Sequence, residues 1–405
     1  MVLELHDSLT GSTRPVRRRP GRPLGMYVCG PTVYAPAHVG HARTYLYFDV
    51  LRRTLEAAGV PVRHVMNLTD FEDKIVVRAD SEGDSWRSLG RREGRGFLSD
   101  LRALGTLPPH RTPRSSENLP AILTVAEALA RTGRVEQRDG AWYYDPPSDP
   151  PGKNFPVASD LLRHAVLDPG VPEPPTDEAL REFVIWKRQD PPAPSWPSPF
   201  GRGVPGWHLE CFAMARRFIG IPVDIHGGGA DLVYPHHYAE NEVALALRGT
   251  PVSRTFVHTG FVTSNGAKMS KSTGTLVGLR GALEEFGPDA LRWYLLDAPY
   301  HQRVAWDPDA AARAREEFRA VRKTLLNSAR PSSRGGVPVR ELEALPRAIA
   351  QDLGRNLGVE SAFDRLRAWT ERLRGSASGT IVGASRGEIR QNYARIGALL
   401  GLRLT

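Results

Sequence analysis

The pattern of apolar positions near the N-terminus predicts a strand, a helix and a second strand. The apolar triplet Met26–Val28 indicates the end of a buried strand, which the following Cys-Gly-Pro breaks. Apolar residues then recur at helical spacing to about Ala58, where Gly59 ends the helix. The run Val60–Met66 predicts the second strand. Such a βαβ unit is typical of a parallel, dinucleotide-type sheet.

The remaining pattern divides the chain into four segments and predicts an α/β fold. Residues 1–84 and 206–275 have the alternating strands and helices of a nucleotide-binding domain in two halves, the second with a glycine turn after the strand Val223–His226. Residues 85–205 combine helices, a strand pair and a helix running into Phe183–Lys187, and they predict an inserted α+β domain. Residues 276–405 are amphipathic throughout, which predicts a C-terminal helical bundle.

A candidate phosphate site lies where the first strand gives way to the helix. A helix N-terminus presents unpaired N–H groups and a partial positive charge, so it favours anions. His38 and His41 lie on one face of the first turn, where imidazoles can donate hydrogen bonds to a phosphate chain. Thr69 and Asp70 follow the second strand and are expected to face the same pocket. Taken alone, the histidine pair is more typical of ordinary polar helix residues or of half a metal site than of a phosphate site.

A candidate metal site comes from the scarcity of cysteine. Cys29 and Cys211 are the two cysteines of the chain, and each lies inside a dense motif, as ligands do. His236 and Glu240 are four residues apart, which places them on one helical face. Zinc accepts thiolate, imidazole and carboxylate ligands. Spacing alone does not bring the two cysteines together.

Composition sets wider bounds. The chain has 405 residues, enough for two or three domains with a sizeable core. It has neither an apolar run of membrane-spanning length nor an apolar leader segment, so we expect a cytoplasmic enzyme without membrane partners. We separately expect a monomer. The formal net charge of +9 suits a polyanionic partner such as RNA, although most of this charge is solvated surface.

Two short motifs together resemble the paired signatures of class I aminoacyl-tRNA synthetases: HVGH at 38–41 and KMSKS at 268–272. The strings CGPTVYAPAHVGHARTY, NLTDFEDK, PSWPSPFG, GWHLEC and DIHGGGADLVYPHH are similar to those of cysteinyl-tRNA synthetase, and the likeness extends through the bundle. The resemblance implies a class I synthetase-type Rossmann (HUP-like) domain with an inserted domain and a helical bundle. It also implies activation of L-cysteine by ATP and Mg²⁺, with Zn²⁺ as cofactor.

The resemblance further implies roles for individual residues. The implied zinc ligands are Cys29, Cys211, His236 and Glu240. The residues implied around the cysteine are Gly30, Thr32, Thr69, Trp207 and Asp231, the last as partner of its ammonium group. Those implied to contact ATP or the adenylate are His38, Gly40, His41, Thr44, Asn67, Gly229, Val262, Lys268 and Lys271. The catalytic residues among them, which stabilise the phosphates, are His38, His41, Lys268 and Lys271.

The acceptor is the open part of this hypothesis. The sequence stops where the bundle stops, whereas the family carries an anticodon-binding domain there, and Ala35 stands where the family has Asp. The short form is similar to the cysteine ligase of mycothiol synthesis, which joins cysteine to an amine. We therefore predict transfer of the cysteinyl group to a small-molecule amine. The alternatives are the 3′ end of tRNA, for a truncated synthetase, and a non-catalytic paralogue with a binding or regulatory role.

Overall fold

The computed structural model describes residues 3–146, 183–264, 267–268, 276–330 and 335–405. Its central sheet has four parallel strands in the order β10-β9-β3-β4. Their bounds are β3 (Leu24–Val28), β4 (Val62–Met66), β9 (Ile225–Gly229) and β10 (Phe256–Thr259). Because β3 pairs with β4 on one side and β9 on the other, the two distant halves of the chain join at the sheet centre. The predicted parallel α/β sheet is confirmed.

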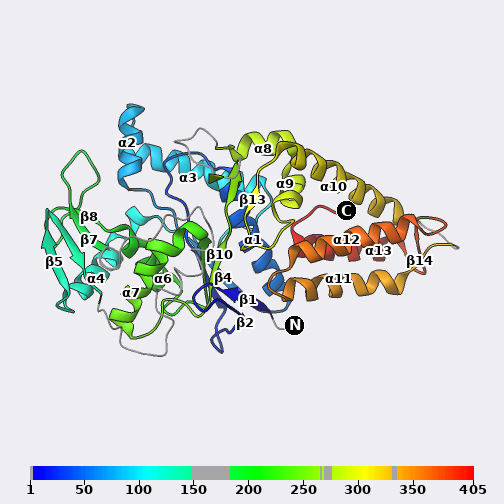
Figure 1. The fold of residues 1–405 in the computed structure, drawn as a ribbon, viewed down its shortest axis with the longest axis horizontal. Coiled ribbons are helices and arrows are strands. Elements are labelled where there is room, and N and C mark those ends of the chain that lie inside the picture. The colour runs from blue at the N-terminus through cyan, green and yellow to red at the C-terminus, as the bar shows by residue number, and fades with distance from the viewer. Residues whose placement is uncertain (1–2, 147–182, 265–266, 269–275, 331–334) are drawn as a thin grey trace.

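Helix α1 (Val39–Ala57) lies between this sheet and the C-terminal helices (Figure 1). It buries side chains around most of its circumference, including Val39, Leu46 and Val50, because it packs on the sheet and on the bundle. His38 caps its N-terminus, with the ring Nδ1 accepting a hydrogen bond from the His41 N–H at 3.4 Å. The helix thus begins at the carboxyl ends of the strands, as predicted.

The buried guanidinium of Arg43 ties α1 to the start of the bundle. It donates to the backbone oxygens of Leu295 at 3.1 Å, Pro299 at 3.0 Å and Tyr300 at 3.1 Å. It also donates to the backbone oxygen of Gly260 at 3.0 Å, beside the last sheet strand. A buried arginine is tolerated when its donors are satisfied, and here backbone oxygens accept from it.

The glycine run of the second half differs from its prediction. Gly227 and its two successors form part of strand β9 instead of a turn after it. A Cβ atom at Gly227 would lie 2.1 Å from the Phe48 ring, so the glycine lets α1 pack closely on the sheet. The glycines were predicted to let a ligand approach the backbone closely. At Gly227 the group that approaches is instead the Phe48 side chain of α1.

In the sequence, an antiparallel sheet and several helices come between the two halves of the central sheet. The sheet has the order β5-β6-β7-β8, with β5 (Val135–Arg138), β6 (Ala141–Tyr144), β7 (Phe183–Arg188) and β8 (Gly203–Pro205). The predicted helix running into Phe183–Lys187 is wrong at those residues, which form β7; the preceding residues lie outside the described chain. The helices here and in the second half are α2 (Asp73–Ser81), α3 (Trp86–Ala103), α4 (Leu119–Ala130), α6 (Trp207–Phe218) and α7 (Tyr238–Arg248).

The C-terminal part is helical, on the right in Figure 1. Its helices are α8 (Leu279–Phe286), α9 (Pro288–Leu295), α10 (Pro308–Ser328), α11 (Val339–Gly354), α12 (Val359–Arg374) and α13 (Arg386–Leu400). The remaining strands are β1 (Glu4–Asp7), β2 (Ser12–Pro15), β11 (Val262–Ser264), β12 (Ala267–Lys268), β13 (Val304–Ala305), β14 (Val337–Pro338) and β15 (Ile381–Val382). Among the described helices, none is long and apolar enough to cross a membrane. The predicted domain boundaries after residues 84, 205 and 275 stay a prediction.

Candidate active site

A cavity of about 380 Å³ lies where β3, β9 and β10 end and α1 begins. This is the position at which open α/β sheets bind ligands, beside the point where the strand order reverses. Its lining includes these residues predicted from the sequence: Cys29, Gly30, Thr32, His38, Gly40, His41, Thr44, Trp207, Gly229, Asp231 and Val262. The fold therefore brings most of the predicted site together in one cavity.

One end of the cavity is formed by the N-terminus of α1. The rings of His38 and His41 stack with their centroids 3.7 Å apart, and both line the cavity. The Phe97 ring meets His41 edge-on and so limits its movement. Two imidazoles at a helix N-terminus provide hydrogen-bond donors and a partial positive charge, which together suit phosphate.

The turn after β3 is held by two residues predicted to contact substrate. Asn67 accepts a hydrogen bond from the Gly30 N–H at 2.9 Å, and its side-chain amide lies 3.3 Å from the Thr69 hydroxyl. A Cβ atom at Gly30 would lie 1.6 Å from the Asn67 backbone oxygen, so only glycine fits there. Asn67 and Thr69 are buried outside the cavity lining, where they position this turn; their contacts with substrate stay a prediction.

Asp70 also differs from its prediction. Its carboxylate accepts hydrogen bonds from the Ser116 N–H at 2.9 Å and the Ser116 hydroxyl at 2.7 Å, and lies 3.6 Å from Arg114. The side chain therefore fixes the segment before α4 instead of facing the cavity. Residues that follow a strand alternate in direction and can turn inward, which spacing alone does not reveal.

The four predicted metal ligands converge beside the cavity, which Cys29 lines. One donor atom each from Cys29, Cys211, His236 and Glu240 lies within 4.8 Å of all the others, and all four residues are buried. They come from the end of β3, from α6, from the turn Val233–His237 and from α7. The fold thus brings together two cysteines that are far apart in the sequence, one directly after β3 and one in α6.

Burial favours the neutral forms of both thiols in this cluster, and a bound divalent cation would convert them to the thiolates that bind metal. Burial raises the pKa of both thiols, for Cys29 well above its usual range, with Cys211 and Glu240 adding to the effect. Burial lowers the pKa of His236 well below its usual range, so the imidazole is neutral, the form that binds metals. Its Nε2 lies 3.1 Å from Glu240 Oε1 but makes no hydrogen bond to any described residue. Thiolate, imidazole and carboxylate donors at this separation suit zinc.

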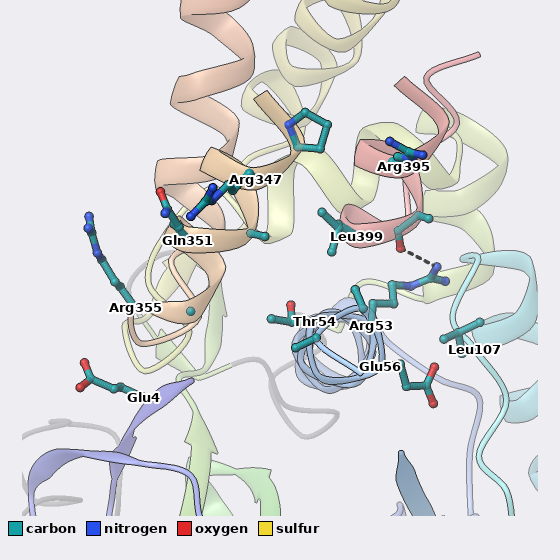
Figure 2. A pocket seen from close by; sticks show the side chains of 16 residues that line it. Glu4, Arg53, Thr54, Glu56, Leu107, Arg347, Gln351, Arg355, Arg395 and Leu399 are labelled. Carbon is teal, nitrogen blue, oxygen red and sulfur yellow. Dashed lines mark hydrogen bonds between the residues drawn. The ribbon is translucent and has the colours of Figure 1, made fainter. Parts of the chain in front are cut away.

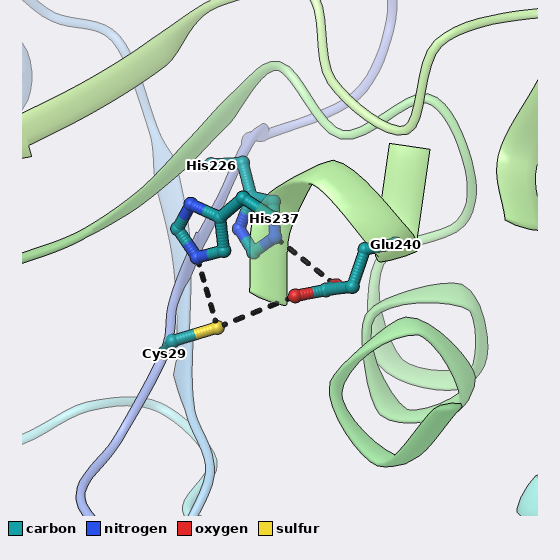
Figure 3. Close-up of side chains that lie close together, drawn as sticks. All are labelled: Cys29, His226, His237 and Glu240. Carbon is teal, nitrogen blue, oxygen red and sulfur yellow. Dashed lines mark hydrogen bonds and ion pairs between the residues drawn. The ribbon is translucent and has the colours of Figure 1, made fainter. Parts of the chain in front are cut away.

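Two further histidines, which the sequence analysis did not assign, form a second candidate metal-binding group with Cys29 and Glu240 (Figure 3). One donor atom from each of these four residues also lies within 4.8 Å of all the others. His226 Nε2 lies 3.1 Å from Glu240 Oε2, and His237 Nε2 lies 3.3 Å from Cys29 Sγ. Their other ring nitrogens lie 3.2 Å from the Tyr27 carbonyl oxygen and 2.7 Å from His258 Nε2, respectively. Both rings are thus anchored on two sides, as is typical of groups that orient metal ligands. The available signal was the density of histidine in DIHGGG and YPHH.

The second lysine motif is only partly described. Lys268 belongs to β12, which pairs with β11 through Thr263. Lys271 lies outside the described residues, so its predicted phosphate contact stays a prediction. The chain after it returns to the cavity, because the Val277 oxygen accepts from the Val39 N–H at 3.1 Å.

A larger cavity lies at the opposite end of α1, between α1, α11 and α13 (Figure 2). Its volume is about 1060 Å³, and Arg53 crosses part of it to donate to the Ala398 oxygen at 3.1 Å. Among the described residues, its lining contains none of those predicted to bind cysteine, ATP or metal. Size therefore does not identify the reaction site here; the convergence of chemical groups does.

Comparisons with known proteins bear on this geometry. The family of class I (C) tRNA synthetase catalytic domains matches residues 16–316. The cysteine–tRNA ligase of Trichlorobacter lovleyi is 34% identical, with 99% of this chain and 85% of that protein covered. The chain belongs to the cysteinyl-tRNA synthetase family. The cysteine–tRNA ligase of Thermococcus onnurineus is 37% identical over 81% of this chain and 68% of its own length. This family member is accordingly a ligase.

Solved structures place the fold in class I. A Mycobacterium tuberculosis methionyl-tRNA synthetase in complex with methionyl-adenylate aligns with a TM-score of 0.63 at 18% identity, covering 94% of this chain and 88% of that one. The LeuRS of Agrobacterium radiobacter, in a ternary complex with tRNA, aligns with a TM-score of 0.66 at 12% identity, covering 95% and 84%. At these identities the likeness concerns the fold, and the predicted class I Rossmann fold is confirmed.

Proposed function

We propose that this enzyme activates L-cysteine with ATP and passes the cysteinyl group to an acceptor. In the first step a carboxylate oxygen of cysteine attacks the α-phosphorus of ATP and pyrophosphate leaves, giving cysteinyl-adenylate; bound Mg²⁺ would neutralise part of the phosphate charge. In the second step an acceptor hydroxyl or amine attacks the carbonyl carbon. AMP then leaves and the acceptor loses a proton. Neither step requires a covalent intermediate on the protein.

The observation that carries this proposal is the meeting of two different chemistries in one cavity. Cys29 lines it at one end, with Cys211, His236 and Glu240 behind it, and His38 and His41 line it at the other. A thiol-selective group and a phosphate-binding group so close together suit a substrate that carries both a thiol and a nucleotide. Cysteinyl-adenylate is such a molecule.

At the thiol end, we propose Cys29, Cys211, His236 and Glu240 as holders of the zinc ion. Zinc supplies a Lewis acid there that favours a thiolate over a hydroxyl, which would separate cysteine from serine. Trp207 stacks on His236 with ring centroids 4.2 Å apart and presents an apolar wall to the cavity. Asp231 also lines the cavity, and its carboxylate suits the ammonium group of the amino acid.

At the phosphate end, the proposal gives His38 and His41 the role of hydrogen-bond donors to the leaving pyrophosphate. The cavity between the thiol end and the phosphate end would hold the nucleotide. Residues that line it and would contact the nucleotide are Gly40, Thr44, Gly229 and Val262. We propose that Lys268 and Lys271 stabilise the negative charge that develops on the leaving pyrophosphate, since phosphoryl transfer is catalysed chiefly by positioning and charge. We expect the enzyme to be located in the cytoplasm and to be a monomer.

Two acceptors are candidates. The curated relatives are named cysteine–tRNA ligases, which favours the 3′ end of a tRNA. The small-molecule amine predicted from the sequence is the second candidate, since an amine also attacks an adenylate directly. Single-turnover transfer from enzyme-bound cysteinyl-adenylate distinguishes them, with cysteine tRNA in one arm and a panel of amines in the other, both at physiological salt.

Isotope exchange between pyrophosphate and ATP tests the activation step. We expect exchange that requires cysteine and falls by about 10⁴ when serine replaces it, because a contact to one substrate group discriminates on that scale. Equal exchange with serine would contradict the zinc–thiolate account. No exchange with any amino acid would instead favour a non-catalytic paralogue.

A further inference from the structure

Tyr45 is a further residue of α1 that lines the reaction cavity. It lies four residues after His41 and therefore on the same face of the helix. Its side chain is 7% exposed, so most of its surface contacts the protein. From this position its hydroxyl reaches the thiol end of the cavity, and its ring reaches the side chain beside His41.

The Tyr45 hydroxyl holds the backbone of Cys29, one of the four proposed metal ligands. It donates a hydrogen bond to the Cys29 carbonyl oxygen at 3.0 Å. The N–H of Cys29 donates to the Gly227 oxygen at 2.8 Å, at the end of the pairing between β3 and β9. The residue that carries the thiol is thus held from α1 on one side of its backbone and from β9 on the other.

The Tyr45 ring packs on the same aromatic side chain that limits the movement of His41. Phe97 meets the Tyr45 ring with centroids 5.2 Å apart and 79° between the ring planes. It meets the His41 ring at 5.9 Å and 87°. Edge-on aromatic contacts have a preferred geometry, so movement of one ring disturbs the next. A continuous set of contacts therefore runs from Cys29 through Tyr45 and Phe97 to His41.

The separation of the two ends matters because cysteinyl-adenylate would occupy both at once. A misplacement of about 1 Å can slow a reaction by about 10². Residues 29–38, which connect β3 to α1, form neither a helix nor a strand of a sheet. A hydrogen bond from α1 back to Cys29 adds a direct constraint on the separation that this connection spans.

We propose that Tyr45 is a positioning residue that sets the separation between Cys29 and the phosphate-binding histidines of α1. The inference rests on the proposed function, because it concerns a molecule that spans both ends of the cavity. Each end keeps its own binding groups when the hydroxyl is removed. Only a ligand that occupies both ends at once should then bind more weakly.

Direct binding tests the proposal without relying on turnover. The zinc-loaded protein is titrated by calorimetry with L-cysteine, with ATP and with a non-reactive cysteinyl-adenylate analogue. The test variant is Tyr45→Phe, which removes the hydroxyl and keeps the ring. The matched control is Tyr47→Phe in the same helix, outside the cavity lining, whose hydroxyl donates to the backbone oxygens of Leu296, at 3.3 Å, and Ala298. Both variants lose a buried hydroxyl that donates to backbone oxygen, so a purely structural effect would appear in both.

We expect the dissociation constant of the analogue to rise about tenfold in Tyr45→Phe, while those of cysteine and ATP stay within about twofold of the wild type. All three should stay within about twofold in Tyr47→Phe, and elemental analysis should show unchanged zinc in both variants. A thermal melt shows whether each variant folds. If Tyr45→Phe does not fold, Phe97→Leu applies the same test at the next contact of the set.

Three outcomes would overturn the proposal. The first is unchanged analogue affinity in the folded test variant, and the second is failure of the analogue to bind the wild type. The third is an equal loss of affinity for cysteine alone or a loss of zinc, because the hydroxyl would then support the thiol end and not the separation.

Pyrophosphate exchange on the same preparations separates this inference from the proposed function. Exchange that requires cysteine, together with analogue binding that Tyr45→Phe does not alter, would overturn the positioning role alone. Analogue binding that Tyr45→Phe weakens, together with no exchange in the wild type, would overturn cysteine activation and leave the positioning role standing.

Discussion

The two ends of the reaction cavity are built in opposite ways. The phosphate end comes from one local motif, since His38 caps α1 and His41 follows one turn later. The thiol end draws its donors from β3, α6, the turn before α7 and α7 itself, and buries all of them. A local motif can bind as soon as its helix forms, whereas the thiol end exists only once the whole domain has folded. Selectivity for the amino acid therefore depends on global structure more than phosphate binding does.

Removal of one thiol at the thiol end should have the largest effect on activity. We expect Cys211→Ala to lose bound zinc and to lower cysteine-dependent exchange toward the serine level, a fall of up to about 10⁴. Elemental analysis of the purified variant, together with exchange assays, measures both effects. Met214→Ala is the matched control, since Met214 is buried in the same helix and provides none of the four donors. Full zinc content in Cys211→Ala would exclude Cys211 from the site.

A change at the phosphate end should be smaller and should spare zinc. His38→Asn keeps a good helix cap but removes the imidazole, so we expect exchange to slow by about 10² with zinc content unchanged. His38→Ala removes the cap as well and should cost about 1 kcal/mol of folding free energy in addition. Exchange rates and urea unfolding separate the two effects. Loss of zinc in folded His38→Asn would show that the two ends are not independent.

The histidines around the donors sharpen the comparison further. We expect His226→Gln to weaken zinc binding by about 10- to 100-fold, because His226 orients Glu240 and changes in such supporting groups have that effect. Competition with a chelator measures the affinity. His110→Gln, on the far side of β4, should leave it unchanged. Wild-type affinity in His226→Gln would mean that Glu240 is held in place by the remaining contacts alone.

The smallest expected effect concerns the stability of the fold in acid. It comes from His64 in β4, which belongs to neither end of the reaction cavity. Burial, with help from Arg52 and His110, lowers the pKa of His64 to about 3. The unfolded state then binds more protons, so stability is full above pH 6.5 and is lost as the pH falls toward 3. Between pH 7 and 5 this histidine should cost about 2 kcal/mol. Urea unfolding of His64→Gln should show a shallower pH dependence than the wild type, whereas exposed Arg63→Gln should not.

Sequence patterns predicted the central fold because the apolar spacing that indicates each strand or helix lies within a short stretch of the chain. The strand at 26–28, the long helix after it and the parallel pairing all follow from apolar spacing and a break at Cys-Gly-Pro. Phe183–Lys187 was harder, since a short apolar run fits a helix or a strand equally well and only its pairing with β6 and β8 decides. The glycines of β9 looked like a turn, because the sequence does not show that the Phe48 ring lies above Gly227.

The site was predictable as far as its motifs were recognisable. The family resemblance supplied the four donors and most of the cavity lining, and the structure brings these together. Thr69 and Asp70 do not line the cavity that they were expected to face, because a polar residue at the end of a strand can bind a ligand or its own protein. The substrate contacts predicted for Asn67 and Thr69 stay a prediction. His226 and His237 were missed, since their partners are fixed by tertiary packing and not by spacing.

Arg43 has a consequence for how the parts of the molecule move. Its side chain, on the helix that His38 caps, donates hydrogen bonds to the backbone oxygens of Leu295, Pro299, Tyr300 and Gly260. Gly260 is two residues before Val262, which lines the reaction cavity. A tilt of the bundle would therefore be expected to shift the cavity wall through the hydrogen bonds of this one guanidinium.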